Sequence, residues 1–422
     1  MVIVFALLAL TVLVTANWYL WRRLFRDTTR APGPARRAGA VLVAGGWALA
    51  VGALVAERTD APFWLQRTLA WPGFLWLALS VYLLLAVVAG EAVRPLLRRF
   101  LERRARTRAP ATAAGIPRPE PVPAAGGGPG GTVPDDGEQG PAPVVVDDPS
   151  RRLFVSRVVA GTAAAVAVGT VGAGTYGVLK GPAVKRVTVP LAKLPRAAHG
   201  YRIAVVSDIH LSPVLGRGFA RKVVDTINST QPDLIAVVGD LVDGSVRNLG
   251  PAAAPLAGLR ARHGSFFVTG NHEYFSGAAE WVDEVRRLGL RPLENARTEL
   301  PHFDLAGVND VAGEDEGQGP DFTKALGDRD RGRACVLLAH QPVQIHDAVD
   351  HGVDLQLSGH THGGQLWPGN LLAAAANPTV AGLERYGDTQ LYVTRGAGAW
   401  GPPTRVGAES DITVIELASR QA

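Results

Sequence analysis

Four long apolar segments in the first 180 residues restrict the fold more than any other feature of the chain. Each holds 19 to 22 consecutive residues without Asp, Glu, Lys or Arg: Val2–Leu20, Ala38–Ala56, Leu69–Gly90 and Val158–Leu179. An α-helix of that length crosses the ~30 Å hydrocarbon core of a bilayer. A buried helix of a soluble protein is the alternative for one segment, but four in one region predict a multi-pass membrane protein.

The arginines between these segments predict an orientation. Six arginines follow the first segment within residues 22–37, two follow the second, and seven follow the third within residues 94–108. Since arginine-rich loops stay in the cytoplasm, the first and third segments are predicted to end inside the cell. The N-terminus and the C-terminal part of the chain then lie on the extracytoplasmic side of the cell membrane.

A segment rich in proline and glycine separates the third apolar run from the fourth. Residues 109–150 contain ten Pro, eight Gly and no aromatic residue, which predicts a linker without a packed core. The segment ends at Ser150-Arg151-Arg152-Leu153-Phe154-Val155, which resembles a twin-arginine export signal. Two arginines that mark the cytoplasmic end of an ordinary helix are the alternative. We therefore divide the chain into a three-helix transmembrane region (1–100), a cytoplasmic linker (101–150), a fourth transmembrane helix with a twin-arginine-like signal (151–180) and a globular domain (181–422).

The charge of the chain is distributed just as unevenly. Residues 1–180 carry a net charge of +9 and residues 181–422 a net charge of −4, and all ten histidines lie in the second part. The net charge of +5 therefore comes from the membrane loops, and we expect no nucleic-acid partner. The single cysteine, Cys335, excludes an intramolecular disulfide and a cysteine-rich zinc site.

Short apolar runs in the second part end directly at polar residues. The runs cover residues 202–206, 234–238, 265–268, 335–338 and 353–357, with helical patterns at 219–229 and 278–288 between them. Alternating strands and helices predict a layered α/β domain. In such a domain, ligands gather at the carboxyl ends of the strands, which is where the polar residues follow.

These polar residues are of metal-ligating types. They are Asp208, His210, Asp240, Asp243, Asn271, His272, His340, His360 and His362. We expect the Asp-x-His and His-x-His pairs to lie on extended strand ends, where residues two apart point the same way. Glycines 239, 270 and 359 are expected to let the chain turn sharply just before a ligand. Oxygen and nitrogen donors of this kind suit Mn, Fe or Zn, and two such cations can clamp a phosphoryl group.

The five blocks together resemble the calcineurin-like metallophosphoesterases. The blocks are Asp208-x-His210, Gly239-Asp240-x-x-Asp243, Gly270-Asn271-His272-Glu273, His340 and Gly359-His360-Thr361-His362, and the resemblance spans about residues 198–417. Gly363-Gly364-Gln365 and Gly398–Pro403 are similar to the membrane-anchored bacterial branch, some members of which act on envelope lipids. The resemblance implies an α/β fold, a layered β-sandwich flanked by helices, which here follows an α-helical transmembrane region.

The resemblance also implies roles for the residues. Asp208, His210 and His362 would hold one divalent metal ion, Asn271, His340 and His360 would hold a second, and Asp240 would bridge the two. His272 would stand beside the phosphate and protonate the leaving oxygen, and Asp243 would orient His272. A hydroxide that bridges the metals would be the nucleophile. Glu273 is expected to cap a helix or to hydrogen-bond locally, and it is given no catalytic role.

The sequence thus predicts a membrane-anchored, outward-facing enzyme, a metal-dependent hydrolase of phosphate esters with two divalent cations (Mn, Fe or Zn). A phosphodiester, a pyrophosphate and a monoester all remain candidate substrates, and the tether to the bilayer makes a lipid-linked phosphate plausible. A membrane-tethered binding or sensory module with a vestigial metal site is the alternative. A transporter is disfavoured, because the apolar segments contain no internal charge.

Overall fold

The computed structural model describes residues 2–59, 61–108 and 149–421, and these fall into two compact units. One unit comprises residues 1–41 and 83–165, and the other comprises residues 42–82 and 166–422. Most of the predicted linker, residues 109–148, lies outside the described residues.

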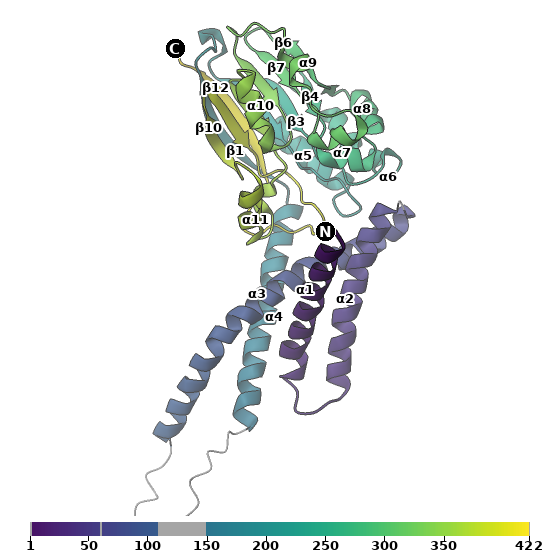
Figure 1. Ribbon diagram of the computed structural model, residues 1–422, viewed down its shortest axis with the longest axis vertical. Helices are drawn as coiled ribbons and strands as arrows, with labels where there is room; N and C mark the ends of the chain where they lie inside the picture. The colour runs from purple at the N-terminus through teal and green to yellow at the C-terminus, as the bar shows by residue number, and fades with distance from the viewer. Residues whose placement is uncertain (1, 60, 109–148, 422) are drawn as a thin grey trace, which may run out of the picture. The chain divides into compact units, whose positions relative to one another are not determined.

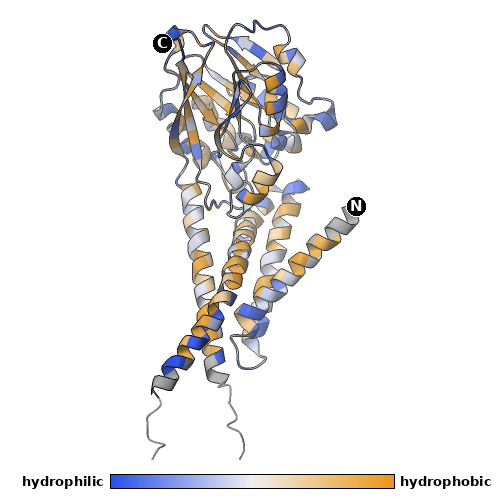
Figure 2. Ribbon diagram, turned by 60° about the vertical axis from the view of Figure 1, so that its left-hand side comes forward, coloured by the Kyte–Doolittle hydropathy of each residue, from blue (hydrophilic) through white to orange (hydrophobic). Residues whose placement is uncertain are grey.

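The N-terminal part of the chain forms long helices. They are α1 (Val2–Trp21), continued by the π-helix η1 (Arg22–Arg26), α2 (Pro34–Arg58), α3 (Phe63–Arg108) and α4 (Pro149–Leu179). Among the described residues, Pro34–Arg58, Phe63–Leu101 and Arg152–Leu179 are long and apolar enough to cross a membrane. Figure 2 shows hydrophobic residues along most of the length of these helices. Helix α1 coincides with the first apolar segment, whose insertion into a membrane stays a prediction.

Helix α3 is much longer than the apolar segment that predicts it. It runs for 46 residues, from Phe63 to Arg108, whereas the uncharged stretch ends at Gly90. The residues after Gly90 are mainly Glu, Leu, Arg and Ala, which favour a helix whether or not they face lipid. The charged end of α3 therefore continues the helix beyond the apolar stretch.

Two mixed β-sheets form the centre of the C-terminal part (Figure 1), and among the described residues each has six strands. The first sheet has the order β1 (Ala183–Leu191), β12 (Asp411–Ser419), β2 (Tyr201–Val206), β3 (Leu234–Val238), β4 (Ser265–Val268) and β5 (Arg291–Pro292). The second has the order β10 (Gly382–Tyr386), β11 (Thr389–Val393), β9 (Leu355–Ser358), β8 (Cys335–Leu338), β7 (Asp304–Gly307) and β6 (Ala296–Glu299). Strands β2, β3 and β4 pair in parallel, and so do β7, β8 and β9.

The central strands of each sheet are buried on both faces. Along β2, Ile203 and Val205 join the core between the sheets, while Ala204 and Val206 face the opposite side. The same alternation with a period of two holds for β3. A strand that is buried on both faces reads as an unbroken apolar run, which is why these strands could be located in the sequence.

Helices cover the outer face of each sheet. Residues of α5 (Arg217–Ser229), α6 (Val246–Ala253) and α8 (Ala278–Arg287) complete the core on the first sheet, and residues of α9 (Phe322–Leu326) and α10 (Ile345–Asp350) complete the core on the second. The remaining helices are α7 (Asn271–Ser276), α11 (Gly369–Ala376) and the short η2 (Arg196–Ala198), η3 (Ala254–Gly258), η4 (Val311–Glu316), η5 (Pro342–Gln344) and η6 (His362–Gly364). The layers follow the order helix, sheet, sheet, helix, so the predicted layered α/β sandwich is confirmed.

The unit that holds the sandwich also includes the adjoining ends of the long helices. Val214, in the loop after β2, packs with Ala53 of α2 and with Ala70 and Phe74 of α3. At the end of α4, Val178 belongs to the core on the first sheet. The chain thus enters the sandwich directly from a helix that could cross a membrane.

Candidate metal centre

The predicted ligands gather at one edge of the sandwich, as expected. Asp208 and His210 follow β2, Asp240 and Asp243 follow β3, and Asn271 and His272 begin α7 after β4. From the second sheet, His340 follows β8, and His360 and His362 follow β9. All of these strands run parallel within their sheets, so their carboxyl ends bring the loops together.

The prediction that the Asp-x-His and His-x-His pairs lie on extended strand ends is wrong. Asp208, His210, His360 and His362 do not extend the strands but have φ angles of 52°, 47°, 70° and 53°. These values lie in the left-handed region, which residues other than glycine seldom occupy. Backbone hydrogen bonds hold the conformation, because Asp208 N donates to Gly239 O at 3.1 Å and His210 N donates to Asp240 O at 3.1 Å.

Two of the three glycines before the ligands also differ from the prediction. Gly239 has a φ of +76° and turns the chain as expected. Gly270 is extended, with a φ of −106°, and Gly359 is not among the residues with positive φ. A Cβ at Gly270 would lie 2.2 Å from Asp240 Oδ1, and one at Gly359 would lie 1.9 Å from Ser207 Oγ. These two glycines therefore allow close approach rather than a turn.

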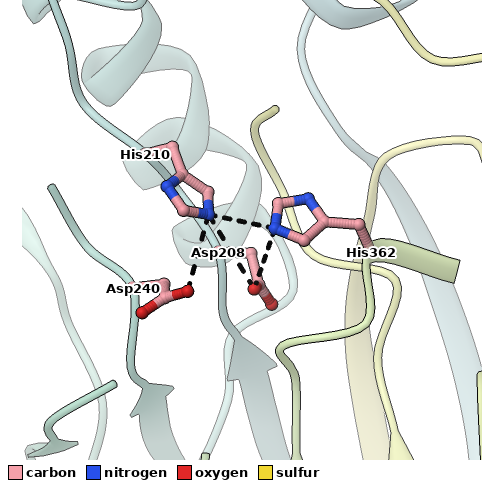
Figure 3. A group of neighbouring side chains, drawn as sticks. All are labelled: Asp208, His210, Asp240 and His362. Atoms are coloured by element: carbon pink, nitrogen blue, oxygen red, sulfur yellow. Dashed lines mark hydrogen bonds and ion pairs between the residues drawn. The ribbon is translucent and has the colours of Figure 1, made fainter. Parts of the chain in front are cut away.

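One group of side chains consists of Asp208, His210, Asp240 and His362 (Figure 3). One ligand atom from each lies within 4.8 Å of the others. The Nε2 atoms of His210 and His362 are 3.0 Å apart, and His362 Nε2 is 3.2 Å from Asp208 Oδ1. His210 Nε2 is 3.7 Å from Asp240 Oδ2. Two carboxylates and two imidazoles thus point into one small volume.

A second group shares Asp240 with the first. It consists of Asp240, His340 and His360, again with ligand atoms within 4.8 Å of one another. His340 donates from Nδ1 to Val238 O at 2.8 Å, which leaves Nε2 directed at Asp240 Oδ2, 3.1 Å away. The predicted fourth member, Asn271, has its side-chain oxygen 3.1 Å from His360 Nδ1. The carboxylate of Asp240 stands between the two groups.

Asp243 connects two histidines beside these groups. Its Oδ1 lies 2.8 Å from Nδ1 of His210 and 2.7 Å from Nδ1 of His272. Since each ring uses Nδ1 toward Asp243, each has Nε2 available on the other side of the ring. The rings of His210 and His272 stand edge to face, with centroids 4.7 Å apart.

The electrostatic environment keeps the carboxylates ionised. Burial would raise the pKa of Asp208 and of Asp240, but nearby histidines outweigh it and hold both below their usual range. For Asp243, burial is outweighed in the same way by His210 and His272, and the pKa falls to about 2.

The histidines fall into two classes. Burial, helped by a neighbouring histidine in each case, outweighs the nearby carboxylates and lowers the pKa of His360 and of His362 to about 4, so both rings are neutral near pH 7. At His340 and His272 burial acts in the same direction, but Asp240 and Asp243 respectively outweigh it and raise the pKa, to about 9 for His272. Asp240 therefore favours a positive charge on the neighbouring ring of His340.

The donor set fits divalent cations. Ionised carboxylates and neutral imidazoles are the forms in which Asp and His bind metal. His340 Nε2 is buried and has no hydrogen-bond partner of acceptable geometry among the described residues, although it faces a carboxylate. A buried ring nitrogen without a hydrogen-bond partner lowers the stability of the fold unless another group, such as a cation, binds it.

Two further residues support the site. Glu273 is fully buried and accepts from the backbone N–H groups of Asp240, Leu241 and Gly270 at 3.0, 2.8 and 2.7 Å. The hydrogen bond from Gly270 N is the local one that was predicted, whereas the bonds from Asp240 N and Leu241 N are not local and link the loops after β3 and β4.

Arg405 was not found from the sequence. It is buried, donates to the carbonyl oxygens of Gly398, His362 and Ala408, and has Nη2 3.2 Å from Nδ1 of His362. Arg405 lies in a segment without strand or helix periodicity, 43 residues after His362. A local sequence pattern carries no signal for such a contact.

The Gly396-x-Gly398 pair also belongs to the scaffold of the site. A Cβ at Gly396 would lie 2.6 Å from Cβ of Asp208, and one at Gly398 would lie 1.9 Å from Ile209 O. These glycines therefore let the loop after β11 pack against the loop that carries Asp208.

Replacement of Gly359 by alanine is expected to damage the site. The new methyl group would lie 1.9 Å from Ser207 Oγ and 2.4 Å from Asp208 Oδ2. We expect the free energy of unfolding to fall by about 1 to 3 kcal/mol and the affinity for metal to fall with it, because Asp208 must move. Gly216→Ala is the control, since nothing lies within 4 Å of its added Cβ. Thermal unfolding and metal titration of both variants test this, and equal behaviour would contradict it.

Comparison with known proteins identifies the same part of the chain. Residues 201–364 match the family described as calcineurin-like phosphoesterase. A Danio rerio protein named "Transmembrane protein with metallophosphoesterase domain" is 38% identical over 250 residues, which cover 56% of this chain and 57% of that protein. An uncharacterized metallophosphoesterase of Helicobacter pylori (strain J99) is 37% identical over 247 residues, 58% of this chain and 66% of that protein.

A shorter relative is matched over nearly its whole length. An uncharacterized metallophosphoesterase of Aquifex aeolicus is 33% identical over 242 residues, which cover 56% of this chain and 92% of that protein. The Danio rerio and Helicobacter pylori proteins are matched over less than two thirds of their length. The similarity is therefore concentrated in one domain that these proteins share.

Proposed function

Because the chain belongs to the calcineurin-like metallophosphoesterases, which are metal-dependent phosphoesterases, we propose that it hydrolyses phosphate esters with a pair of divalent cations. The observation that carries this proposal is the position of Asp240, whose carboxylate is shared by two separate groups of potential ligands. A single carboxylate between two donor groups is the arrangement of a dinuclear site.

Each cation has a proposed set of ligands. Asp208, His210 and His362 would hold one, Asn271, His340 and His360 would hold the other, and Asp240 would bind both. When bound, the cations would polarise the phosphate group and lower the pKa of a water molecule that attacks phosphorus. Mn, Fe and Zn all suit these oxygen and nitrogen donors.

His272 and Asp243 have a different role in this proposal. His272 is the first residue after Asn271 and is 15% exposed at its side chain, so it lies at the rim of the site rather than inside it. The hydrogen bond to Asp243 fixes its ring and leaves Nε2 free to donate to the leaving oxygen of the substrate. Asp243 positions both His272 and the ligand His210.

We further propose that the domain is anchored in the cell membrane and faces outward. The arginine-rich ends of the first and third apolar segments support this orientation. Ser150-Arg151-Arg152-Leu153-Phe154 at the start of α4 would act as the export signal, and a pathway for folded proteins would allow metal to be loaded before export. The division into transmembrane helices 1–100, linker 101–150, helix 151–180 and catalytic domain 181–422 is part of the same proposal.

An exposed apolar rim supports a lipid-linked phosphate ester as the substrate. Phe275 and Trp400, which are 69% and 49% exposed, both contact the ring of His272. Trp367, Leu371 and Leu372 follow the last ligand and are 54%, 65% and 77% exposed. Within the same unit, Tyr82 of α3 donates from its hydroxyl to Trp367 O at 3.0 Å. These apolar side chains are exposed to solvent beside a helix that is proposed to cross the membrane, which favours a substrate with acyl chains.

Turnover by the full chain tests the proposed chemistry. The chain purified in detergent should hydrolyse bis(p-nitrophenyl) phosphate after addition of Mn, Fe, Zn or Co. Absence of turnover with all four cations, in a chain whose circular dichroism shows it folded, would contradict the proposal and favour a binding or sensory module with a vestigial site.

A second comparison tests the lipid preference. We expect the double variant Leu371→Ser/Leu372→Ser to lower the ratio of kcat/KM for p-nitrophenyl dodecyl phosphate to that for p-nitrophenyl ethyl phosphate about tenfold, because the rim loses two leucine contacts to the chain. The matched control is Val184→Ser/Leu383→Ser, which removes exposed apolar side chains elsewhere in the domain. An unchanged ratio in the rim variant would remove the support for a lipid-linked substrate.

A further inference from the structure

A charged cavity lies far from the metal centre in sequence, in the unit that comprises residues 1–41 and 83–165. It has a volume of about 530 Å³ and is lined by Arg23 of η1 and by residues of α3, which are Glu91, Arg94, Pro95, Arg98 and Arg99. Two segments separated by 68 residues thus contribute to one pocket. Both belong to arginine-rich ends of apolar helices.

Positive charge predominates in this cavity. Four arginines and one glutamate line it. Glu91 is shared by Arg23 at 2.9 Å and by Arg94 at 3.3 Å, and Arg23 also pairs with Asp27. Arg98 and Arg99 are exposed and form no ion pair with any residue of the described chain. A cavity with this balance attracts an anion.

Two of the arginines have incompletely bonded donors. Arg94 is only 7% exposed, and its Nε lies 3.3 Å from Glu91 Oε1 without forming a hydrogen bond of acceptable geometry, while the buried Nε of Arg23 has no hydrogen-bond partner among the described residues. A buried guanidinium N–H without an acceptor is unfavourable by about 1 to 3 kcal/mol. Acceptor oxygens in the cavity would remove that cost, and planar guanidinium groups match the oxygens of a phosphate.

The cavity lies directly after the uncharged stretches of both segments. Arg23 lies just after α1 (Val2–Trp21), and Glu91 follows Gly90, the last residue of the uncharged stretch of α3. In helices that cross a membrane, this is the level of the lipid phosphates. Val93, Leu96 and Phe100 are 50%, 63% and 56% exposed, but they lie on the side of α3 roughly opposite to Glu91, Arg94 and Arg98.

We propose that this cavity binds the phosphate group of an anionic membrane lipid, with Arg23, Arg94, Arg98 and Arg99 around the headgroup. The general excess of arginine at the cytoplasmic ends of membrane helices accounts for the presence of basic residues in this part of the chain. It does not explain why four of them converge on one cavity in which the buried Nε of Arg23 lacks a hydrogen-bond partner. The proposal is independent of the reaction at the metal centre.

Lipid retention by the full chain tests the proposal. The chain is exchanged into mixed micelles of phosphatidylglycerol and phosphatidylcholine, and the lipid that stays bound is quantified by native mass spectrometry. The wild type should retain phosphatidylglycerol in preference to phosphatidylcholine. Arg98→Gln/Arg99→Gln should reduce that preference by about fivefold for each arginine, while Arg98→Lys/Arg99→Lys should keep most of it. These two side chains are exposed, so their replacement leaves the packing of α3 intact.

The control removes the same charge from a nearby surface. Arg30→Gln/Arg37→Gln replaces two exposed arginines that do not line the cavity and should leave the preference unchanged. Equal retention of the two lipids by the wild type, or an equal loss in both double variants, would overturn the proposal. A parallel experiment with inorganic phosphate at about 10 mM distinguishes a lipid headgroup from free phosphate as the occupant of the cavity. Release of phosphatidylglycerol by phosphate would assign the cavity to a soluble anion, and continued retention supports the lipid.

Discussion

Asp240→Asn is expected to remove bound metal and to abolish turnover together. Asp240 is the residue that both ligand groups share, and its Oδ2 lies 3.1 Å from His340 Nε2 and 3.7 Å from His210 Nε2. The amide keeps the shape and one oxygen, so the hydrogen bond from His272 N to Oδ1, 2.9 Å long, can persist. It loses the negative charge and the second oxygen on which a bridging ligand depends.

We expect the metal content of the full chain to fall from about two ions to less than one, and kcat/KM to fall by at least about 10³-fold. Elemental analysis of wild type and variant, purified side by side, gives the metal content, and circular dichroism verifies the fold. Asp354→Asn is the matched control, because it changes a carboxylate that is also mostly buried but accepts from Cys335 N and pairs with Lys193, outside the site. An Asp240→Asn chain with two ions and full turnover would refute the shared-carboxylate assignment.

The sequence could locate the site because the strands that carry it are buried on both faces. In β2, β3 and β8 each residue except Arg202 meets either the core between the sheets or the core under the helices. Such strands are short unbroken apolar runs, and the first polar residue after each run marks the edge of the sheet. The loops that carry Asp208, Asp240 and His340 could therefore be assigned to one edge.

The outer strands gave no comparable signal. In β1 the first six residues are exposed or half-exposed and include Lys185 and Arg186, yet the strand pairs in parallel with β12, more than 200 residues later. Strand β10 is exposed or half-exposed throughout. Pairing between such distant segments depends on tertiary structure, and local polarity does not reveal it.

The local backbone conformation of the candidate ligands also could not be predicted from the spacing of the residues. A spacing of two residues is compatible with an extended strand and with the left-handed turns that His360 and His362 adopt. The predicted residues do lie together, but the conformation expected of them was wrong. What decides the conformation is the close contact of neighbouring loops, such as that between Gly359 and Ser207.

The supporting residues differ in how far the sequence revealed them. Glu273 lies next to a candidate ligand, so local hydrogen bonding could be expected, but its link to Asp240 N and Leu241 N depends on the pairing of β3 with β4. Arg405 reaches His362 from a loop of irregular structure. Contacts of this kind follow from the assembled fold.

His272→Asn is expected to slow the reaction without removing metal, and the size of the effect should depend on the leaving group. The ring of His272 is fixed by Asp243 at 2.7 Å and belongs to neither of the two ligand groups that share Asp240. If its Nε2 protonates the leaving oxygen, kcat for an alkyl phosphate ester should fall by about 10² to 10⁴-fold.

A p-nitrophenyl ester should be affected far less by His272→Asn, because p-nitrophenolate leaves readily without a proton. Rates of the variant and wild type on an alkyl and a p-nitrophenyl ester, with the metal content of each preparation, make the comparison. His199→Asn, at an exposed histidine away from the site, should leave all of these values unchanged. An equal loss on both esters would show that His272 acts on binding or on the geometry of Asp240, to which its backbone N–H donates, and not on the leaving group.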